Sequence, residues 1–584
     1  MGIDKGITIK MSLEIPEAPA LNSTNGTYPR VGATVHTEIL IVGGSVGGCA
    51  AALAALRNGR RVILVEESDW IGGQLTSQAV PPDEHGWIES FGCTASYRSF
   101  REGVRAYYRK YYPLREKYRS VRNLNPGNGW VSPLCHEPRV ALAVLEGMLA
   151  PYLSAGRLTL LTSHRATGCD VDGDRVRAVS LCNLRTGAVV VVEANYVIDG
   201  TDLGELLPLS GTDYVTGFES RRVTGEPRAP LEAQPGNSQA FSFCFVLDYA
   251  VNQESAPIAR PANYDFWRSF IPPLAPAWPG PLLSWTITHP RLMTPTTYHF
   301  DPENEPSRAF AGLWTYRRIL DRTLFDDGTF PSDLCTVNWP QTDYLRGDLC
   351  TCNDEDRAVH LAEARQQSLS LVYWLQTEAP GPDAPGSHGR IGWPSLRLRG
   401  DVTGSGESDL GLARMPYIRE SRRISAETTI VEQHVSAACR PGEGPGSERG
   451  ERYFDSVGIG YYRIDLHPST GGDNYIDVES LPFQIPLGAL IPVRMENLLP
   501  AAKNIGTTHI TNGCYRVHPV EWNIGEAAGA LAAFCLANRR TPREVRNTPR
   551  LLADFQRTIV SQGFELAWPE NLALDEGDPH RHAR

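Results

Sequence analysis

Apolar residues group into short runs near the start of this chain, with glycine-rich and polar stretches between them. Residues 38–42 form a run that suits a buried parallel strand, residues 49–56 combine alanine with leucine as in a tightly packed helix, and residues 61–65 form a second strand-like run. Gly59 ends the expected helix before the second run begins. The pattern predicts a strand, a turn, a helix and a second strand, which is the repeating unit of a parallel sheet.

A glycine-rich turn joins the first strand to the helix. The amides at the start of such a helix, and its positive dipole end, favour a bound diphosphate, and glycines let the diphosphate approach the backbone closely. The second strand ends in an acidic pair, where a carboxylate can accept both ribose hydroxyls of an adenosine. We therefore expect a dinucleotide site, formed by Gly43, Gly44, Ser45, Val46, Gly47, Gly48, Glu66 and Glu67.

This turn departs from the usual G-x-G-x-x-G at one position. Gly43 and Gly48 fit the first and third glycines, but Ser45 stands at the second. Serine is small enough for near approach, and the surrounding strand, helix, strand and acid restore the specificity of the motif. The alternative interpretation is a glycine-rich turn in an ordinary α/β protein.

Further strand-like runs at 157–162, 166–171, 176–183 and 188–194, with a turn at 172–174, predict a β-meander. The long middle of the chain carries weaker patterns. Residues 239–247 suit a strand with one aromatic face, residues 358–375 have apolar positions at helical spacing, and the arginine-rich segment 415–435 is expected to be partly helical. Proline and glycine clusters at 380–394 and 441–452 indicate loops or lids.

Three stretches resemble cofactor-binding segments of a known group of flavoproteins. Residues 70–77, WIGGQLTS, resemble the glycine pair that follows the second strand in the glutathione reductase superfamily. Residues 196–202 resemble the strand and turn that close its first FAD-binding section, and residues 497–506, followed by a small-residue helix at 523–536, resemble its C-terminal flavin-binding segment. On these segments the chain resembles the FAD-dependent oxidoreductase family, which is related to the fumarate reductase and succinate dehydrogenase flavoproteins.

The resemblance implies FAD as the cofactor. A helix that begins near Val520 or Glu521 would aim its amides at the pyrimidine edge of the isoalloxazine ring, where negative charge builds up on reduction. The resemblance adds the following residues to the expected cofactor site: Gly72, Gly73, Gln74, Leu75, Asp199, Gly200, Thr201, Asn504, Asn523 and Ile524.

The expected fold class is α/β, with a Rossmann-like FAD-binding domain of the glutathione reductase type, a β-meander and an inserted α+β substrate domain. The expected division is a disordered leader at 1–34, the first part of the FAD-binding domain at 35–212, the inserted substrate domain at 213–480, the second part of the FAD-binding domain at 481–545, and a C-terminal helix and tail at 546–584.

Composition excludes several classes of function. The net charge of -11 argues against a nucleic-acid partner, because binding to phosphates relies on a basic face. Twelve cysteines without any Cys-x-x-Cys argue against a zinc or iron-sulfur site, so no metal is expected. No apolar run approaches the length of about 18 residues that spans a membrane, and residues 1–30 contain no apolar signal core. We therefore expect a cytoplasmic protein without a membrane partner.

A flavin oxidoreductase needs a substrate carbon held over flavin N5 and a nearby group that moves the accompanying proton. Residues 507–518 lie where related flavoproteins place side chains against the ring. The resemblance therefore makes His518 and His509 candidate proton carriers, and Arg516 or Tyr515 candidates to orient a substrate oxygen or to stabilise anionic flavin. A structural role for His518 and covalent flavin attachment at His509 are the alternatives.

The leading functional hypothesis is an FAD-dependent dehydrogenase or oxidase that transfers a hydride from a small organic substrate to flavin N5, with oxygen or an unlinked molecule as the electron acceptor. An NADPH-dependent flavin monooxygenase is the first alternative, but residues 203–206 lack the serine and arginine expected after Asp199-Gly200 in that class. An FAD-containing RNA-modification or scaffold protein is the second alternative, and the acidic composition disfavours it.

Overall fold

A parallel sheet forms from the apolar runs near the start of the chain, because their side chains are buried on both faces. Its strands run in the order β3-β2-β1-β6, and a short strand from far along the chain, β21, pairs in parallel with β6. The bounds are β1 Thr34–Val42, β2 Val62–Glu66, β3 Leu158–Thr162, β6 Val189–Asp199 and β21 Leu498–Pro500. The mixed α/β fold with a parallel sheet agrees with the sequence-based prediction.

The computed structural model describes residues 34–250, 256–303, 312–381, 391–406, 410–440, 449–570 and 572–574. The expected leader, apart from its last residue, and most of the two expected proline and glycine loops lie outside these residues.

The predicted meander continues the sheet as β4 His164–Asp172, β5 Arg175–Asn183 and β6. We expected separate strand segments at 188–194 and from 196 onwards, but β6 runs unbroken through both. One of its edges pairs with β1, and its other edge pairs first with β5 and then, at residues 197–199, with β21. The strand is continuous because each of its two halves has its own partner on that edge.

Two helices of small residues pack against the sheet and against each other. They are α1 Val46–Arg57 and α13 His518–Asn538. A Cβ atom added to Gly525 would lie 2.0 Å from the carbonyl oxygen of Gly47, and one added to Gly529 would lie 2.2 Å from that of Ala51. The two helices therefore meet at backbone distance. The helix α12 His509–Tyr515 precedes α13 and was not expected from the sequence.

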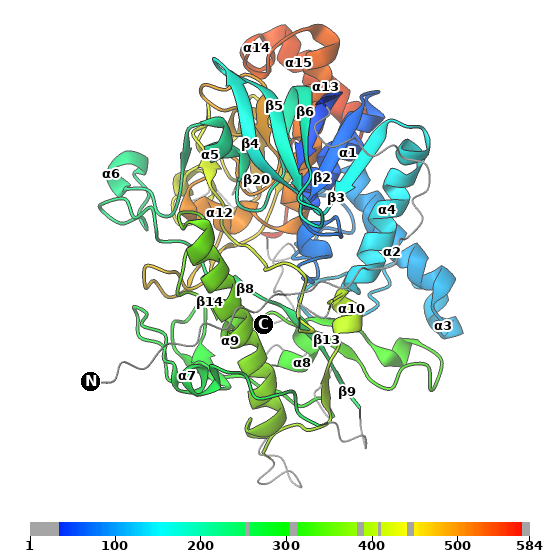
Figure 1. Ribbon diagram of the computed structural model, residues 1–584, viewed down its shortest axis with the longest axis vertical. Helices are drawn as coiled ribbons and strands as arrows, with labels where there is room; N and C mark the ends of the chain where they lie inside the picture. Colours follow the sequence, from blue (N-terminus) through cyan, green and yellow to red (C-terminus); the bar gives the residue numbers. More distant parts are fainter. Residues whose placement is uncertain are drawn as a thin grey trace, which may run out of the picture.

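The lower half of the molecule in Figure 1 contains the long helix α9 Asp354–Thr377 beside a small antiparallel sheet. The strand order is β12-β13-β9-β15, with β12 Arg318–Leu320, β13 Leu334–Val337, β9 Phe245–Tyr249 and β15 Leu396–Leu398. Tryptophan, phenylalanine and tyrosine side chains between these elements form a second hydrophobic core, separate from that of the parallel sheet.

Of two expectations for the middle of the chain, the strand was wrong in detail and the partly helical segment is helical only at its end. The single strand expected at 239–247 is divided into β8 Phe241–Ser242 and β9, because these pair with different partners, β14 Asp343–Tyr344 and β13. The segment 415–435 forms only the short strand β16 Arg423–Ile424 and the short helix α11 Glu432–Val435. Arg419 and Arg423 are buried there and donate to backbone carbonyls and to acidic side chains, instead of lying on the surface of a helix.

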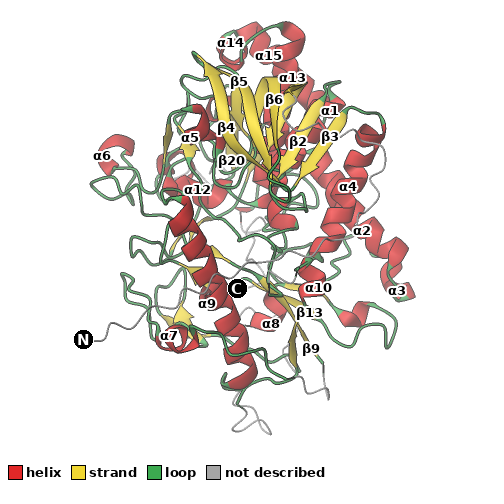
Figure 2. Ribbon diagram, in the orientation of Figure 1, coloured by secondary structure: helices red, strands yellow, loops and turns green. Residues whose placement is uncertain are grey.

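The remaining elements complete the two halves (Figure 2). The helices are α2 Ala95–Tyr111, α3 Glu116–Arg119, α4 Pro138–Ser154, α5 Leu206–Ser210, α6 Arg221–Thr224, α7 Tyr264–Ser269, α8 Leu313–Tyr316, α10 Gly400–Thr403, α14 Pro542–Asn547 and α15 Pro549–Ser561. The strands are β7 Tyr214–Val215, β10 Thr286–Thr288, β11 Pro295–Thr297, β14 Asp343–Tyr344, β17 Ser456–Gly460, β18 Ile464–Leu466, β19 Ile476–Val478 and β20 Phe483–Pro486. Within the described residues, no helix is long and apolar enough to cross a membrane.

Replacing Gly529 by alanine is expected to lower the free energy of unfolding by about 1–3 kcal/mol, because the new methyl group would collide with the backbone of α1. Gly147 of α4 is a matched helical control, since it is exposed and an added Cβ meets nothing within 4 Å. Gly147→Ala should leave stability unchanged or raise it by up to about 1 kcal/mol. Urea unfolding of both variants measures the difference; equal stability of Gly529→Ala and the wild type would contradict the close helix contact.

Candidate active site

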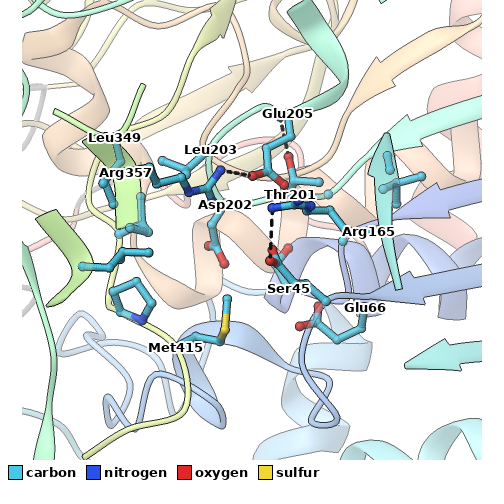
Figure 3. A pocket seen from close by; sticks show the side chains of 18 of the residues that line it. Ser45, Glu66, Arg165, Thr201, Asp202, Leu203, Glu205, Leu349, Arg357 and Met415 are labelled. Atoms are coloured by element: carbon cyan, nitrogen blue, oxygen red, sulfur yellow. Dashed lines mark hydrogen bonds and ion pairs between the residues drawn. The ribbon is translucent and has the colours of Figure 1, made fainter. Parts of the chain in front are cut away.

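A cavity of about 380 Å³ opens where the parallel strands end, beside α9. Ligands of open parallel sheets bind at this edge, where the strand order reverses. Figure 3 shows Ser45, Glu66, Thr201, Asp202 and Arg357 around it. We call this space the strand-end cavity. The expected cofactor residues Gly43, Ser45, Glu66, Glu67, Gly200 and Thr201 belong to its lining.

The glycine turn is built by direct backbone contacts. Gly43 has φ +99°, and a Cβ on it would lie 2.3 Å from the carbonyl carbon of Gly200. The hydroxyl of Ser45 caps α1 by accepting a hydrogen bond of 3.2 Å from the amide of Gly48. Serine at the second motif position therefore holds the helix start in place as well as being small. The expected residue Val46 begins the helix, and Gly44 and Gly47 complete the turn.

The glycine pair of the following loop lies against this turn. Gly72 and Gly73 both have positive φ angles, and Gly73 would bring a Cβ within 3.0 Å of the Cα of Ser45. Gln74 and Leu75 continue in a short 3₁₀ helix and are buried. The predicted Gly-Gly segment and the predicted glycine turn are thus neighbours in the fold.

Glu66 lies where the sequence places the ribose-binding carboxylate. Its two oxygens accept hydrogen bonds from the amides of Gly44, at 2.8 Å, and Ser68, at 2.9 Å. Burial raises the pKa of Glu66 to about 7. A carboxylate has about four acceptor sites, so two remain for further donors in the strand-end cavity.

Asp199 and Asn504 shape the turn after β6. The carboxylate of Asp199 accepts hydrogen bonds from the amides of Thr201 and Leu206, and burial raises its pKa to about 6. Asn504 donates to the backbone carbonyl of Asp199 at 3.0 Å. Asn523 donates to the carbonyl of Val457, and Ile524 is part of the hydrophobic core. None of these four expected cofactor residues lines either cavity described here.

Sequence reasoning missed a buried lysine beside the glycine turn. Lys503 donates to Asp202 at 2.6 Å and to Glu521 at 3.1 Å, and Gln74 also donates to Glu521 at 2.6 Å. Burial alone would lower the pKa of Lys503, but the two carboxylates raise it above its ordinary value. The amide of Gly47 donates to Glu521 at 3.3 Å, so this carboxylate lies at the positive end of α1. A charged residue in the apolar stretch 498–505 was the available signal.

The four expected catalytic residues lie apart from one another. His518 is fully buried, its Nδ1 accepts a hydrogen bond of 3.0 Å from the amide of Asp83, and burial lowers its pKa to about 3. His509 pairs with Glu420 at 2.8 Å and lies over the ring of Phe218.

The other two expected catalytic residues, Tyr515 and Arg516, also contact different parts of the protein. Tyr515 stacks on Phe483 and donates to the backbone of Gln484. Arg516 donates to the hydroxyl of Tyr417 and to the backbone carbonyl of Asp465, both at 2.8 Å. None of the four lines either cavity, but Arg516 and His518 contact or approach residues that do.

A second cavity, of about 220 Å³, is lined by residues from two stretches, 287–340 and 462–477. We call it the aromatic cavity, because its lining includes Tyr298, Tyr316, Trp339, Tyr462 and Tyr475. Arg317, Asp465 and His467 are among its polar lining residues. Arg317 lies 3.4 Å from Asp83, the residue whose amide binds His518.

The residues present fit a flavin dinucleotide. Glycines approach one another at backbone distance beside the strand-end cavity, and an acid ends the second strand. Between the two cavities, buried polar atoms have no hydrogen-bond partner within the protein, namely Gln74 Oε1, Gln78 Oε1, Arg516 Nε and His518 Nε2. Such atoms are costly to bury unless a ligand satisfies them.

Together, the parallel sheet, its glycine turn and the buried polar atoms named above define a dinucleotide-binding flavoprotein. The sequence matches the family described as FAD dependent oxidoreductase over residues 38–559, and the chain belongs to this family. As a member of this family it is an enzyme, an FAD-dependent oxidoreductase, and FAD is its cofactor. A comparison with curated protein sequences gives no match.

Solved structures share parts of the chain at low identity. The L-proline dehydrogenase from P. horikoshii is 14% identical over 32% of this chain and 24% of its own, with a TM-score of 0.15. The flavin-dependent monooxygenase PieE, in complex with FAD and substrate, is 14% identical over 37% and 36%, with a TM-score of 0.21. An open flavocytochrome c3 fumarate reductase is 18% identical over 29% and 34%, with a TM-score of 0.19. The chain thus spans about a quarter to just over a third of these structures, and scores at this level carry no argument about the reaction.

Glu66→Ala is expected to weaken FAD retention by roughly 10- to 150-fold, the equivalent of about 1.5–3 kcal/mol for a lost charged hydrogen bond. Equilibrium dialysis of FAD against the apoprotein measures this. Glu146→Ala, at an exposed carboxylate of α4, is the matched control and should bind FAD normally. Full FAD retention by Glu66→Ala would remove this residue from the cofactor site.

Lys503→Met is expected to lower the free energy of unfolding by about 3–5 kcal/mol, because it leaves the buried Glu521 and the partly buried Asp202 without the lysine. Adding Glu521→Gln removes one of the two carboxylates, so the double variant should recover part of the loss. Guanidinium unfolding of the two variants provides the comparison. A double variant no more stable than Lys503→Met would show that the pair is not coupled.

Proposed function

We propose that this FAD-dependent oxidoreductase is a dehydrogenase or oxidase that removes a hydride from a small organic substrate in the aromatic cavity. The observation that carries the proposal is that the lining of that cavity contacts Arg516 and, through Asp83, His518, which the family resemblance places near the flavin ring. Arg317 lies beside Asp83, which binds His518, and Asp465 accepts from Arg516. A substrate in the aromatic cavity would therefore lie next to the groups expected around the flavin ring.

Bound FAD supplies a hydride acceptor at N5 and passes the electrons to oxygen or to an unlinked acceptor. The residues of the chain bind and orient. In this proposal the glycine turn, the cap at Ser45 and the carboxylate of Glu66 hold the dinucleotide. Arg516, fixed by Tyr417 and Asp465, presents a permanent positive charge near the ring, which favours negative charge there.

The described residues contain one parallel sheet with one glycine turn at the start of a helix, and the proposal assigns this turn to FAD. This supports a hydride donor other than NAD(P)H. A cytoplasmic location is part of the same proposal. Its support is that all twelve cysteines are free thiols, which is typical of a reducing compartment.

The purified protein is expected to be yellow and to keep its flavin absorption under anaerobic conditions when NADPH or NADH is added. Rapid bleaching by either nicotinamide would favour the monooxygenase alternative. A protein that stays yellow and binds tRNA would favour the RNA-modification alternative. Bleaching by an organic metabolite alone supports the dehydrogenase or oxidase proposal, and the visible spectrum records each case.

A further inference from the structure

The aromatic cavity contains a histidine that is oriented like a general base. His467 Nδ1 lies 2.6 Å from Asp343 Oδ2, and the histidine side chain lies at the cavity lining. Asp343 is itself held by the hydroxyl of Ser242, at 2.8 Å, and by Arg419, at 3.0 Å. With Nδ1–H donated to the carboxylate, Nε2 keeps its lone pair and is free of that bond.

Asp343 has the charge that this role requires. Burial alone would raise its pKa, but Arg419 and His467 lower it below the ordinary value, so the carboxylate stays ionised. The other histidine candidates lack this arrangement. His518 is fully buried and His509 is paired with Glu420 away from both cavities, whereas the side chain of His467 is 19% exposed and lines the aromatic cavity.

The charge of the cavity lining favours an anionic ligand. Three arginines (Arg291, Arg317 and Arg463) and two aspartates (Asp465 and Asp477) line the cavity, and the carboxylate beside Arg317 is that of Asp83, outside the lining. The whole protein, by contrast, has a net charge of -11. Arg317 is buried, and its Nε and Nη1 have no hydrogen-bond partner in the protein, although Nη1 lies 3.4 Å from Asp83. Its planar fork suits a carboxylate.

The size of the cavity limits the distance between the carboxylate and the reacting group of a substrate. Its volume of about 220 Å³ is below the roughly 300–1,000 Å³ of pockets that hold drug-sized ligands. A molecule that reaches both Arg317 and His467 in this space must carry its carboxylate and its reacting group close together. Tyr298 also lines a cleft of about 570 Å³, together with Trp285 and Phe300.

Resting on the proposed function, we propose that the aromatic cavity binds a small hydroxy acid, with its carboxylate on Arg317 and its hydroxyl proton taken by His467, which Asp343 orients. In the reaction the C–H bond breaks and its hydride, with two electrons, goes to FAD. The O–H bond breaks and its proton goes to His467 Nε2. The substrate carbon becomes a carbonyl, so the hydroxy acid is oxidised to an oxo acid while FAD is reduced.

Benzoate is a suitable binding probe, because it has a carboxylate on an aromatic ring and no oxidisable hydroxyl. Its titration into the FAD-loaded protein is followed through the flavin absorption. We expect saturable binding in the wild type and at least tenfold weaker binding in Arg317→Met, with Arg317→Lys between them. Equal affinity of the wild type and both Arg317 variants would overturn the anion site.

The pH dependence tests His467 directly. The charged or titratable groups that face it or its partner are Asp343, Asp465, Tyr475, Arg419 and Arg516. Proton exchange at His467 Nε2 changes the charge beside a bound carboxylate, so benzoate affinity should depend on pH. His467→Gln should abolish this dependence. His289→Gln should retain it, because His289 lines the same cavity but its Nδ1 accepts from the amides of Arg291 and Leu292.

Anaerobic mixing with glycolate, lactate, mandelate and 3-phenyllactate tests the reaction. We expect at least one of these to bleach the flavin, and to do so at least 100-fold more slowly in His467→Gln. Asp343→Asn should also slow the reaction and alter its pH profile. Dithionite should reduce all variants equally.

Bleaching by an uncharged alcohol or an amine, with none of the four acids active, would overturn this inference but leave the proposed function standing. Bleaching only by NADPH or NADH would overturn both.

Discussion

The contact between α1 and α13 is the constraint on which the rest of the structure depends. Gly47 and Gly525, and Ala51 and Gly529, meet at a distance that leaves no room for a side chain. This contact brings the glycine turn near residue 45 against the C-terminal segment near residue 520. It thereby places Glu521 at the start of α1 and Lys503 beside Asp202. The cofactor region is thus assembled from two segments that are far apart in the sequence.

Buried charges divide the site into regions of different character. At the strand ends a lysine lies between two carboxylates, whereas the aromatic cavity has more arginines than aspartates and a histidine supported by a buried carboxylate. Burial strengthens each of these interactions and also makes each unpaired group costly. In the proposed function, this pairing pattern distinguishes the face that would accept an anionic substrate from the face that would hold the dinucleotide.

The local patterns of the sequence predicted much of the sheet and the glycine turn, because strand runs, turn glycines and the terminal acid are all read from neighbouring residues. Residues that act through distant partners were not predictable in this way. His467 depends on Asp343, and Lys503 depends on Asp202, more than 100 residues away in each case. Their roles exist only after the chain has folded. The division of 239–247 into two strands has the same cause, since β8 and β9 pair with different strands of the middle segment.

One edge of β6 has a consequence for the order of assembly during synthesis. On the edge that does not pair with β1, residues 197–199 lack their partner strand β21 until residues 498–500 have left the ribosome. By then β1 to β6 have been complete for about three hundred residues. Long-range pairing of this kind is slow, and an open strand edge invites association with other chains. The whole middle segment must therefore fold or be sheltered before the sheet closes. Binding of the cofactor is expected to occur late in the synthesis of the chain.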